Sequence, residues 1–322
     1  MSLSELSESL FFTIIIPTYN RADILSDCLL ALAKQTINPE FFEVIVGNDG
    51  SKDHTLSVLQ QLKEVVPYRL RFFSQENKGP NVIRNRAIKM AEAPVVVFFN
   101  DDTIALPDCL ENHLIFHKRF SEENIAVLGK LTIDPSIPAT PFSQVALDLS
   151  YAQWQGKRNL DWRAFYTCNL SVKKSFLLKY GLFDENIWYN DDVELGSRLD
   201  RHGLRIIYCW EAVGYHRHYL SEQDYLAIAE KDGKGLAVWY CSKPEYREYL
   251  RMLHFPTLMP ITTQFKYLAG DMIFHPLLRP LWLKFARKLL SFNENLALKL
   301  YLKCYQAVKR ETIKKEVKRL SC

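Results

Sequence analysis

The sequence predicts an α/β fold, with a mainly parallel central sheet flanked by helices, and a helical carboxyl-terminal extension. From residue 11 to about residue 129, short apolar runs of strand length alternate with segments at helical spacing, which is the pattern of strands joined by crossover helices. The run over residues 94–99 is almost wholly apolar, as expected of a strand buried on both faces of a sheet. Beyond residue 222 the pattern is mostly helical, and no glycine follows Gly270.

The first part of the chain contains five predicted strands, which lie at residues 14–17, 42–46, 70–73, 95–99 and 125–128. Predicted helices separate them at residues 24–34, 55–65, 82–91 and 107–120. Residues 131–165 then break the alternation with three prolines and two tryptophans, and an irregular stretch of that length in a compact domain is usually functional. The alternation resumes with strands at residues 166–172, 205–209 and 212–216 and with helices at residues 174–179 and 192–201.

The size and composition indicate a globular protein. The chain has 322 residues, of which 48% are hydrophobic and 24% charged, enough for one large domain or a domain with an appendage. The seven cysteines are scattered without a Cys-x-x-Cys pair, which predicts reduced thiols rather than a disulfide framework or a zinc site. Residues 1–10 carry no basic residue, unlike a signal peptide, and no apolar run reaches the about 18 to 20 residues that cross a bilayer. A cytoplasmic location is therefore expected.

Charge is distributed unevenly along the chain. Residues 281–322 contain eleven Lys and Arg residues against three Glu residues, an excess of eight, whereas the whole chain carries a net charge of +4. The first 280 residues therefore carry a net charge of −4. Nucleic-acid binding is not expected, because acidic residues of the main domain surround the cleft that the strand pattern predicts.

Two adjacent carboxylates, Asp101 and Asp102, follow the buried strand directly. In open α/β sheets, ligands bind in the crevice beyond the carboxyl ends of such strands. Neighbouring carboxylates repel each other unless they are solvated or bridged, and a hard divalent cation with oxygen ligands is a natural bridge. A metal in that position favours phosphate chemistry. The alternative is that both side chains belong to a solvated turn and cap the helix that begins near Pro107.

Two earlier strands end in polar segments at the same edge of the predicted sheet. These segments are Pro-Thr-Tyr-Asn-Arg at residues 17–21 and Gly-Asn-Asp-Gly-Ser at residues 47–51. On its glycine turn, Asp49 can accept a hydrogen bond from an N–H group such as the imide edge of a pyrimidine. The alternative is a plain turn in which Ser51 or Asp53 caps the next helix. Neither Gly-x-Gly-x-x-Gly nor Gly-x-x-x-x-Gly-Lys occurs, so phosphates must be held by another device.

Further short motifs extend this pattern along the chain. Together with the segments above they form an ordered series at residues 14–21, 48–51, 77–79 with 84–85, 100–102, 169–171, 181–185, and 191–195 with 198. In order and spacing the series resembles glycosyltransferase family 2, and the resemblance covers residues 12–218. It implies a GT-A fold and an inverting enzyme that moves a sugar from a nucleotide-diphosphate-sugar donor, with a UDP-sugar expected first.

The resemblance also implies roles for individual residues. Those that bind the donor nucleotide are Pro17, Thr18, Tyr19, Asn20, Arg21, Asp49, Ser51, Lys78, Arg84 and Asp101. Within this set residues 18–20 line the base pocket, Asp49 reads the edge of the base, and Arg84 lies near the base and diphosphate. Asp102 matches the ligand of a divalent metal, Mg²⁺ or Mn²⁺, which acts as a Lewis acid on the leaving diphosphate. Asp192 matches the catalytic base that takes the proton of the acceptor hydroxyl.

Residues near the end of the segment that resembles the family, between positions 191 and 218, are expected to complete the site. His216, or His218 in its place, corresponds to a histidine of the metal or diphosphate site, although a histidine at a strand end is often a solvated or structural hydrogen-bonding residue. Asp191 and Arg198 are expected to support the base or the acceptor. Acidic residues are favoured at a helix start in any case, so helix stabilisation is the alternative role of Asp191 and Asp192.

The sequence departs from the usual family pattern at three positions. Asn48 and Asn100 stand where aspartate is usual, and Asp191 stands where glutamate is usual. Asn100 removes a carboxylate near the metal, so weaker cation affinity is expected, and it favours the alternative of a catalytically degenerate sugar-nucleotide-binding protein. Retention of Asp102 and Asp192 opposes that alternative. A nucleotidyltransferase is a second alternative, but its glycine-rich, basic opening loop is missing.

Two regions point to the acceptor. Trp154 and Trp162 lie in the irregular stretch and are expected to stack on acceptor sugars, unless they simply pack the core. The basic residues 281–322 interleave with apolar residues, which predicts either a helix on an anionic membrane or a helical cap packed on protein. The Gln-x-x-Arg-Trp motif of processive synthases is missing, so transfer of a single residue is expected.

We therefore predict a short tail at residues 1–10, a GT-A domain at residues 11–220 and a helical, basic extension at residues 221–322. Residues 11–130 are the expected nucleotide-binding half of the domain and residues 131–220 the acceptor-binding half. The predicted enzyme is a glycosyltransferase of the hexosyltransferase type. It is expected to act on a glycan or lipid-linked acceptor in the synthesis of a bacterial surface polysaccharide. Peripheral contact with the inner face of the cytoplasmic membrane is part of this expectation.

Overall fold

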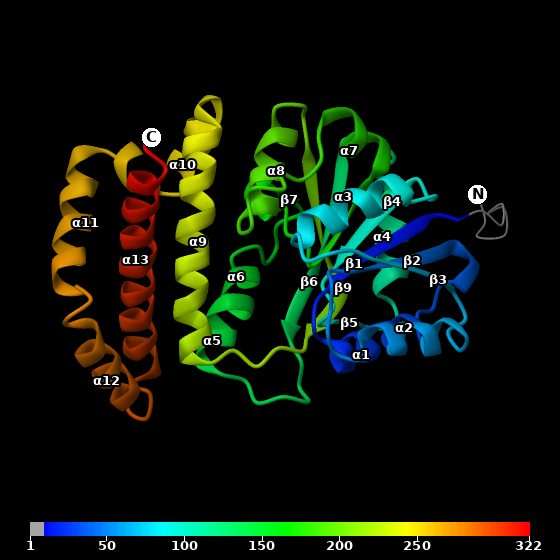
Figure 1. The fold of residues 1–322 in the computed structure, drawn as a ribbon, viewed down its shortest axis with the longest axis horizontal. Helices are drawn as coiled ribbons and strands as arrows, with labels where there is room; N and C mark the ends of the chain where they lie inside the picture. The colour runs from blue at the N-terminus through cyan, green and yellow to red at the C-terminus, as the bar shows by residue number, and fades with distance from the viewer. Residues whose placement is uncertain (1–9) are drawn as a thin grey trace. The chain divides into compact units, whose positions relative to one another are not determined.

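A computed structural model describes residues 10–322 and divides them into two units (Figure 1). The first unit contains the described residues up to Pro138, together with Leu147–Glu185 and Leu195–His218. The second unit is formed by Ala139–Ala146, Asn186–Glu194 and Tyr219–Cys322. The sheet lies in the first unit, and the long carboxyl-terminal helices lie in the second.

Within residues 10–322, the sheet of the first unit has nine strands. They are β1 (Phe12–Thr18), β2 (Phe42–Asn48), β3 (Arg69–Ser74), β4 (Val95–Phe99), β5 (Thr103–Ala105), β6 (Ile125–Ile133), β7 (Asn159–Leu160), β8 (Asn169–Lys173) and β9 (Arg205–His216). Their order is β3-β2-β1-β4-β8-β6-β9-β5, and β7 pairs with β9. The pairs β3-β2, β2-β1, β1-β4 and β6-β9 are parallel, and the pairs made by β8, β5 and β7 are antiparallel. The expected α/β class is confirmed, with a sheet that is mixed beyond β4.

Helices cover both faces of this sheet. They are α1 (Ala22–Leu32), α2 (Thr55–Lys63), α3 (Pro80–Met90), α4 (Cys109–Arg119), α6 (Leu149–Ala152), α7 (Lys174–Tyr180) and α8 (Asp191–Asp200), with short turns η2 (Pro39–Phe41), η3 (Gln144–Asp148) and η4 (Trp162–Ala164). Along β1, Phe12, Ile14 and Ile16 join one hydrophobic core and Ile15 joins the other. Side chains of a strand alternate between faces, so a run with apolar residues on both faces is what this double covering requires.

Two strands differ from the expectation. Residues 205–216 form one strand, β9, instead of the predicted two, and its pairing with β6 shifts by a bulge in which Cys209 faces Gly129 while Val213 faces Lys130. The three-residue strand β5 was not predicted. Because β5 pairs with the end of β9, with Thr103 opposite His216, it ties the turn after β4 to that end.

A buried polar chain links α4 to β8. The Nε2 atom of His117 and the Nδ1 atom of His113 each lie 2.8 Å from Ser171 Oγ, and Nε2 of His113 lies 2.9 Å from Asn169 Oδ1. The Asn169 amide donates onward to the carbonyls of Lys130 and Ala212. Burial lowers the pKa of His113 to about 4, so its ring is neutral at pH 7. The Asn-Leu-Ser motif at residues 169–171 therefore has a structural role in this fold.

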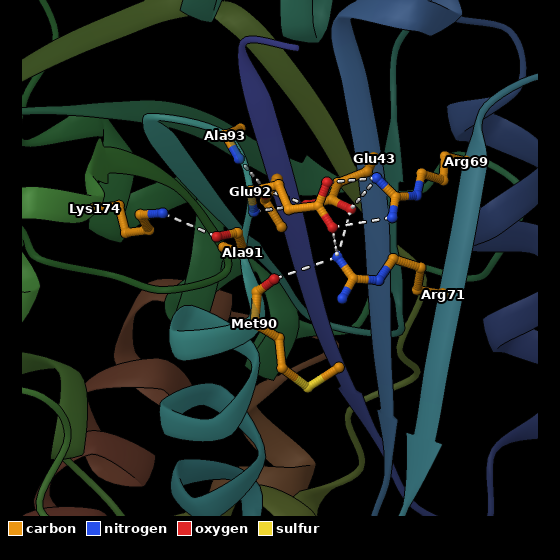
Figure 2. A network of polar contacts seen from close by, with 9 residues as sticks. Glu43, Arg69, Arg71, Met90, Ala91, Glu92, Ala93 and Lys174 are labelled. Atoms are coloured by element: carbon orange, nitrogen blue, oxygen red, sulfur yellow. Dashed lines mark hydrogen bonds and ion pairs between the residues drawn. The ribbon is translucent and has the colours of Figure 1, made fainter.

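A second polar network lies where β1, β2 and β3 begin (Figure 2). The fully buried Glu43 accepts hydrogen bonds from Thr13 Oγ1 at 2.8 Å, from the Glu92 backbone N–H at 2.9 Å and from Arg71 at 2.9 Å. Arg71 and Arg69 also pair with the Glu92 carboxylate. The network joins the starts of β1, β2 and β3 to the turn before β4.

The second unit is helical, as predicted for the extension. It contains α5 (Pro141–Ser143), α9 (Glu222–Ser242), α10 (Arg247–Met252), α11 (Ile261–Ile273), α12 (Arg279–Leu289) and α13 (Glu294–Arg319), with turns η5 (Pro244–Tyr246) and η6 (Pro256–Leu258). Helix α13 lies between α9 on one side and α11 on the other (Figure 1). Phe142, Tyr225 and Tyr301 form the centre of a small core between α5, α9 and α13.

The second unit also holds a disulfide between Cys241, at the end of α9, and Cys322, with their Cα atoms 5.5 Å apart. The expectation of reduced thiols throughout is therefore wrong for this pair, whose partners are 81 residues apart in sequence and meet through the packing of α13 on α9. Cys28, Cys109, Cys168, Cys209 and Cys304 form no disulfide within the described residues. Among the helices of residues 10–322, none combines the length and apolar character needed to span a membrane.

Candidate active site

The turn after β4 places Asp101 and Asp102 in a buried position at the carboxyl edge of the sheet. The two residues are 5% and 4% exposed, which opposes the alternative that they belong to a solvated turn. Strand β5 follows at once, and its pairing with β9 brings His216 beside the turn, with Nε2 of His216 3.6 Å from Asp102 Oδ2. Residues more than a hundred positions apart in sequence thus meet through a backbone ladder.

Arg21 bridges the two carboxylates. Its NH1 group donates to Asp101 Oδ1 at 2.7 Å and its NH2 group donates to Asp102 Oδ2 at 2.9 Å. NH2 also lies 3.5 Å from His218 Nδ1. The second oxygen of Asp101 accepts a hydrogen bond from the Thr18 hydroxyl at 2.8 Å. Residues 18 and 21 of the first polar segment, which were expected to contact the nucleotide, hold the aspartate pair in this structure.

The two carboxylates differ in acidity. Burial raises the pKa of Asp101 to about 6, although Arg21 opposes the shift. Burial acts in the same direction on Asp102, but His216 and Arg21 together outweigh it and hold the pKa of Asp102 below its ordinary value. Burial has the opposite effect on His216, whose pKa it lowers, so the lasting positive charge beside Asp102 is that of Arg21. Asp102 is therefore ionised at neutral pH.

These groups fit a divalent cation as a partial ligand set. Among residues 10–322, no group of three His, Cys, Asp or Glu side chains is arranged to hold a metal. The Oδ1 atom of Asp102, however, is buried and has no hydrogen-bond partner among residues 10–322. A buried carboxylate oxygen without a partner destabilises the fold unless a bound ligand interacts with it. Mg²⁺ is commonly bound by one or two carboxylates plus substrate phosphates and water. Asp102 and His216 fit that arrangement, with the remaining ligands supplied by a bound donor.

Asp49 follows β2 and is engaged by its own loop. Its Oδ1 atom accepts from the Gln75 side chain at 2.9 Å and the Lys78 N–H at 3.0 Å, and its Oδ2 atom accepts from the Gly79 N–H at 2.8 Å. A carboxylate offers about four acceptor positions, so one position on Oδ2 is left for a ligand N–H. Gln75 was missed by sequence reasoning, although a polar residue directly after the predicted strand at 70–73 is the signal that points to it.

Two hydrogen bonds join the loops after β1 and β2, and a third closes the loop after β2. The Asn20 N–H donates to Ser51 Oγ at 2.8 Å, the Lys52 N–H donates to Asn20 Oδ1 at 2.7 Å, and the Ser51 N–H donates to Asn48 Oδ1 at 2.9 Å. The side chains of Asn48, Asn20 and Ser51 therefore stabilise the loops that follow β1 and β2. The Tyr19 side chain is 43% exposed there, which leaves its ring available to a base.

Arg84 and Lys78 lie on and before α3. The Arg84 guanidinium is 7% exposed, donates to Asn81 Oδ1 at 3.0 Å and lies over the Phe183 ring. Lys78 contributes its backbone N–H to Asp49, and its side chain is exposed. The structure thus brings the Arg21, Asp101, Asp102, His216 and His218 group together, whereas Arg84 is packed between α3 and the segment after α7.

Asp191 and Asp192 begin α8 within the second unit, where residues 186–194 pack against α9. Asn190 donates from Nδ2 to Asp232 Oδ1 at 2.8 Å, and the buried Glu194 pairs with Lys243 at 2.7 Å. Gly235 of α9 allows the approach, because a Cβ atom there would lie 2.0 Å from the Tyr189 carbonyl oxygen. The half-buried Asp192 accepts a hydrogen bond from the Val193 N–H at 2.8 Å. Sequence reasoning missed Asp232, for which no local motif exists.

The remaining expected acceptor residues are largely packed. Trp154 and Trp162 are 8% and 3% exposed, and Trp154 contacts Tyr151 and Tyr208, which favours the alternative that both tryptophans pack the core. Arg198 donates to the Leu182 carbonyl at 2.6 Å and supports the loop at 181–182. Trp188, in contrast, is 63% exposed in the segment that precedes Asp192.

Sequence comparisons find similarity to glycosyltransferases. Residues 13–132 match the family described as Glycosyl transferase family 2. The chain is 28% identical over 230 residues to validoxylamine A glucosyltransferase of Streptomyces hygroscopicus subsp. limoneus, which covers 63% of this chain and 50% of the relative. It is 25% identical over 244 residues to the poly(ribitol-phosphate) beta-N-acetylglucosaminyltransferase TarS of Staphylococcus aureus (strain Mu50), which covers 75% of this chain and 39% of TarS. The chain thus spans half or less of the length of these two relatives.

Structural comparison agrees on the fold. The chain is similar to the mannosyltransferase PcManGT from Pyrobaculum calidifontis, solved in complex with GDP-Man and Mn²⁺, with a TM-score of 0.65 and 20% identity. The match covers 94% of this chain and 87% of that one. At this identity the likeness establishes the fold, and the expected GT-A type of fold is confirmed. Residues 13–132, a little over a third of the chain, are thus similar to glycosyl transferase family 2, and the relatives named above are glycosyltransferases.

Proposed function

We propose that this protein is a metal-dependent, inverting glycosyltransferase that moves one sugar from a nucleotide-diphosphate-sugar to a hydroxyl of a glycan or lipid-linked acceptor. The observation that carries the proposal is the buried Asp102, ionised at neutral pH, with one unpartnered oxygen and His216 beside it at the carboxyl edge of the sheet. The similarity of residues 13–132 to glycosyl transferase family 2 supports this reaction class. A UDP-sugar is the first donor to test, because the free acceptor position of Asp49 suits an imide N–H.

In the proposed reaction, Asp102 and His216 would hold Mg²⁺ or Mn²⁺, which supplies Lewis-acid stabilisation of the charge on the departing diphosphate. The acceptor oxygen forms a bond to the anomeric carbon while the bond from that carbon to the diphosphate oxygen breaks. The electron pair leaves with the nucleoside diphosphate, and the hydroxyl proton passes to Asp192. Attack from the face opposite the leaving group inverts the anomeric configuration. Trp188, exposed near Asp192, is available to stack on an acceptor sugar.

A polymeric surface glycan is the proposed acceptor class. TarS, one of the relatives, is named for transfer to poly(ribitol-phosphate), a polymer. Transfer of a single sugar per encounter is proposed because the sequence lacks the Gln-x-x-Arg-Trp motif of processive synthases.

The function is tested by nucleoside diphosphate release from the full chain. With UDP-sugars or GDP-sugars, Mn²⁺ and a glycan acceptor, release is expected, with loss in EDTA and recovery on adding Mn²⁺. Asp102→Asn is expected to lower the rate by a factor of about 100 or more, since metal-centred charge stabilisation contributes several kcal/mol. A thermal-shift screen identifies the donor first, because a ligand at 100 times its dissociation constant stabilises by about 2.7 kcal/mol.

Two outcomes of that experiment contradict the proposal. Donor binding without release in the presence of every acceptor class supports a degenerate sugar-nucleotide-binding protein. Release of pyrophosphate from a nucleoside triphosphate and a sugar phosphate supports a nucleotidyltransferase. Asp108→Asn, which changes a carboxylate just before α4, is the matched control and should leave release unchanged.

We further propose that the second unit contacts an anionic membrane through α11 and α12. Ile261, Phe265, Leu268 and Met272 are spaced along one face of α11 and are 66%, 65%, 52% and 68% exposed. None of the thirteen residues of α11, all of them described, is buried. The apolar surface continues with the exposed side chains Leu277, Leu281, Phe285 and Phe292. Beside it lies a mostly apolar pocket of about 260 Å³ next to Lys314.

The positive charge of residues 261–322 favours an anionic membrane as the partner of this surface. Residues 261–322 contain thirteen Lys and Arg residues against four Asp and Glu residues. An exposed apolar face on a strongly basic element is typical of helices that lie in the plane of an anionic bilayer, where each basic residue near the surface contributes about 1 kcal/mol. Such contact would hold the enzyme near a lipid-linked acceptor.

Vesicle co-sedimentation tests the membrane proposal. The full chain is expected to bind vesicles containing about a third of anionic lipid at least tenfold better than neutral vesicles, because the predicted attraction is largely electrostatic. Phe265→Ser with Met272→Ser should lower that binding, whereas Leu56→Ser with Val65→Ser, two exposed apolar residues of the first unit, should not. Equal binding to both vesicle types, or equal loss in both variants, contradicts the proposal. Point variants are preferred to truncation because α13 supplies Tyr305 and Lys309 to Asp232.

A further inference from the structure

We propose that Arg21 is the resident counter-ion of the Asp101 and Asp102 pair and competes with the divalent cation for Asp102. Before a cation arrives, its guanidinium neutralises the pair. When a cation binds, Arg21 releases Asp102, so the metal affinity of the site is set by an internal exchange. This inference rests on the proposed metal dependence of the enzyme.

The competition follows from the use of one carboxylate. Asp102 Oδ2 accepts the Arg21 NH2 group at 2.9 Å and is also the oxygen that lies 3.6 Å from His216 Nε2, while Oδ1 has no hydrogen-bond partner among the described residues. A cation ligated by Asp102, through Oδ1 or through Oδ2 beside His216, therefore binds a carboxylate that Arg21 already occupies. Positive charges at such short range repel strongly, above all where protein rather than water surrounds them. Arginine cannot relieve this repulsion by deprotonation, because its guanidinium stays charged throughout the physiological pH range.

Burial explains why a counter-ion is present at all. The Asp101 and Asp102 side chains are both 6% exposed, and two adjacent carboxylates removed from water are unfavourable unless a positive charge compensates them. Arg21 provides that charge in a forked arrangement, with one N–H group for each carboxylate. Its own side chain is 33% exposed, so it reaches the pair from the solvent side and has room to withdraw.

The backbone before Arg21 is shaped to aim it. Asn20 adopts a φ angle of +53°, a left-handed conformation that costs free energy for a residue other than glycine and persists where the surroundings enforce it. The enforcing contacts are the hydrogen bonds of Asn20 to Ser51 and Lys52. Helix α1 begins immediately after Arg21, with Ala22, so the side chain projects from a fixed point at the helix start. Strained, doubly anchored backbone of this kind is typical of functional sites.

The departure of Asn100 from the family pattern strengthens the same conclusion. With asparagine at position 100, the turn carries two carboxylates, and the single positive charge of Arg21 leaves the group with one net negative charge at neutral pH when both are ionised. A divalent cation that adds to the group without displacing Arg21 would leave it with a net positive charge in a buried place. Exchange of Arg21 for the cation leaves the carboxylate pair neutralised instead.

Mn²⁺ binding without any nucleotide tests the proposal. The full chain is titrated with Mn²⁺ and free Mn²⁺ is followed by electron paramagnetic resonance, for the wild type, Arg21→Met and Arg21→Lys. Arg21→Met is expected to lower the Mn²⁺ dissociation constant at least tenfold, and Arg21→Lys, which keeps the charge but cannot bridge both carboxylates, is expected to give an intermediate value. Thermal unfolding without metal should occur at a lower temperature in Arg21→Met, with Mn²⁺ recovering most of the loss. Asp102→Asn is the control that should abolish binding.

The outcomes separate this inference from the proposed function. If the wild type binds Mn²⁺ and Arg21→Met binds it equally or more weakly, Arg21 does not compete with the cation and the inference is wrong, while metal dependence stands. If no variant binds Mn²⁺ with or without the donor, metal dependence itself fails and the inference fails with it. A merely structural role of Arg21 would lower stability without tightening Mn²⁺ binding, so tighter binding in Arg21→Met distinguishes the two roles.

Discussion

Asp192→Asn is expected to lower the rate of sugar transfer by a factor of about 10² to 10⁴ while leaving donor binding nearly unchanged. Asparagine keeps the shape of the side chain but cannot accept the proton of the acceptor hydroxyl. The loss should appear in kcat measured by nucleoside diphosphate release, whereas the dissociation constant of the donor, measured by thermal shift or calorimetry, should stay within about twofold of the wild-type value. Unimpaired turnover would remove Asp192 from the mechanism.

Asp191→Asn is the matched control for that prediction. It alters the neighbouring carboxylate on the same helix start, so both variants lose one favourable interaction with the helix dipole. Equal losses in both variants would mean that the acidic pair stabilises α8 rather than catalyses transfer. A second comparison uses Asp232→Asn, which weakens the contact with Asn190 and should reduce kcat without changing the pH dependence that Asp192 imposes.

Glu43→Ala is expected to destabilise the first unit by about 3 to 5 kcal/mol, the usual cost of removing one partner from a buried ion pair. The fully buried Glu43 carboxylate accepts from Thr13, Arg71 and the Glu92 backbone, and its removal takes away a buried acceptor that these donors share (Figure 2). The urea-unfolding midpoint measures the change. Nucleotide affinity at temperatures where the variant is folded should be unaffected, because the network lies at the strand starts and the candidate site lies at the strand ends.

Glu92→Ala is the control from the same network. The Glu92 side chain is 49% exposed and pairs with Arg69 and Arg71, and exposed ion pairs contribute about 0 to 1 kcal/mol. A similar loss in both variants would show that the network acts through its surface charges. A small loss in Glu43→Ala would contradict the inference that this carboxylate is the centre of the network.

The elements with a strong hydrophobic period could be predicted from the sequence. The predicted strand at 95–99 has the observed bounds of β4, and the predicted strand at 42–46 lies within β2. The wholly apolar composition of these runs already implied cover on both faces. Strand β5 could not be predicted in this way, because its three residues, Thr103–Ala105, are too few to carry a period and depend on pairing with β9.

The sequence allowed prediction of which residues belong to the candidate site, but not of which of them contact one another. Strand ends identified Asp49, Asp101 and Asp102, since the carboxyl ends of parallel strands share one edge. That Arg21 would bridge the aspartates depends on the left-handed backbone at Asn20, which no local pattern reports. The burial of Trp154 likewise depends on distant rings such as Tyr208. Tertiary contacts of this kind decide which polar residues meet a ligand and which meet each other.

The bulge in β9 determines on which face of the sheet the His216 side chain lies. His216 lies seven residues after Cys209, and in an unbroken strand an odd separation would turn the two side chains to opposite faces of the sheet. Their partners on β6, Gly129 and Ile133, are four residues apart, so the observed pairing puts His216 on the same face as Cys209. The three unpaired residues between Cys209 and Val213 reverse the parity. In an unbroken strand Val213, rather than His216, would stand opposite Ile133, and the imidazole would lie beyond the reach of Asp102.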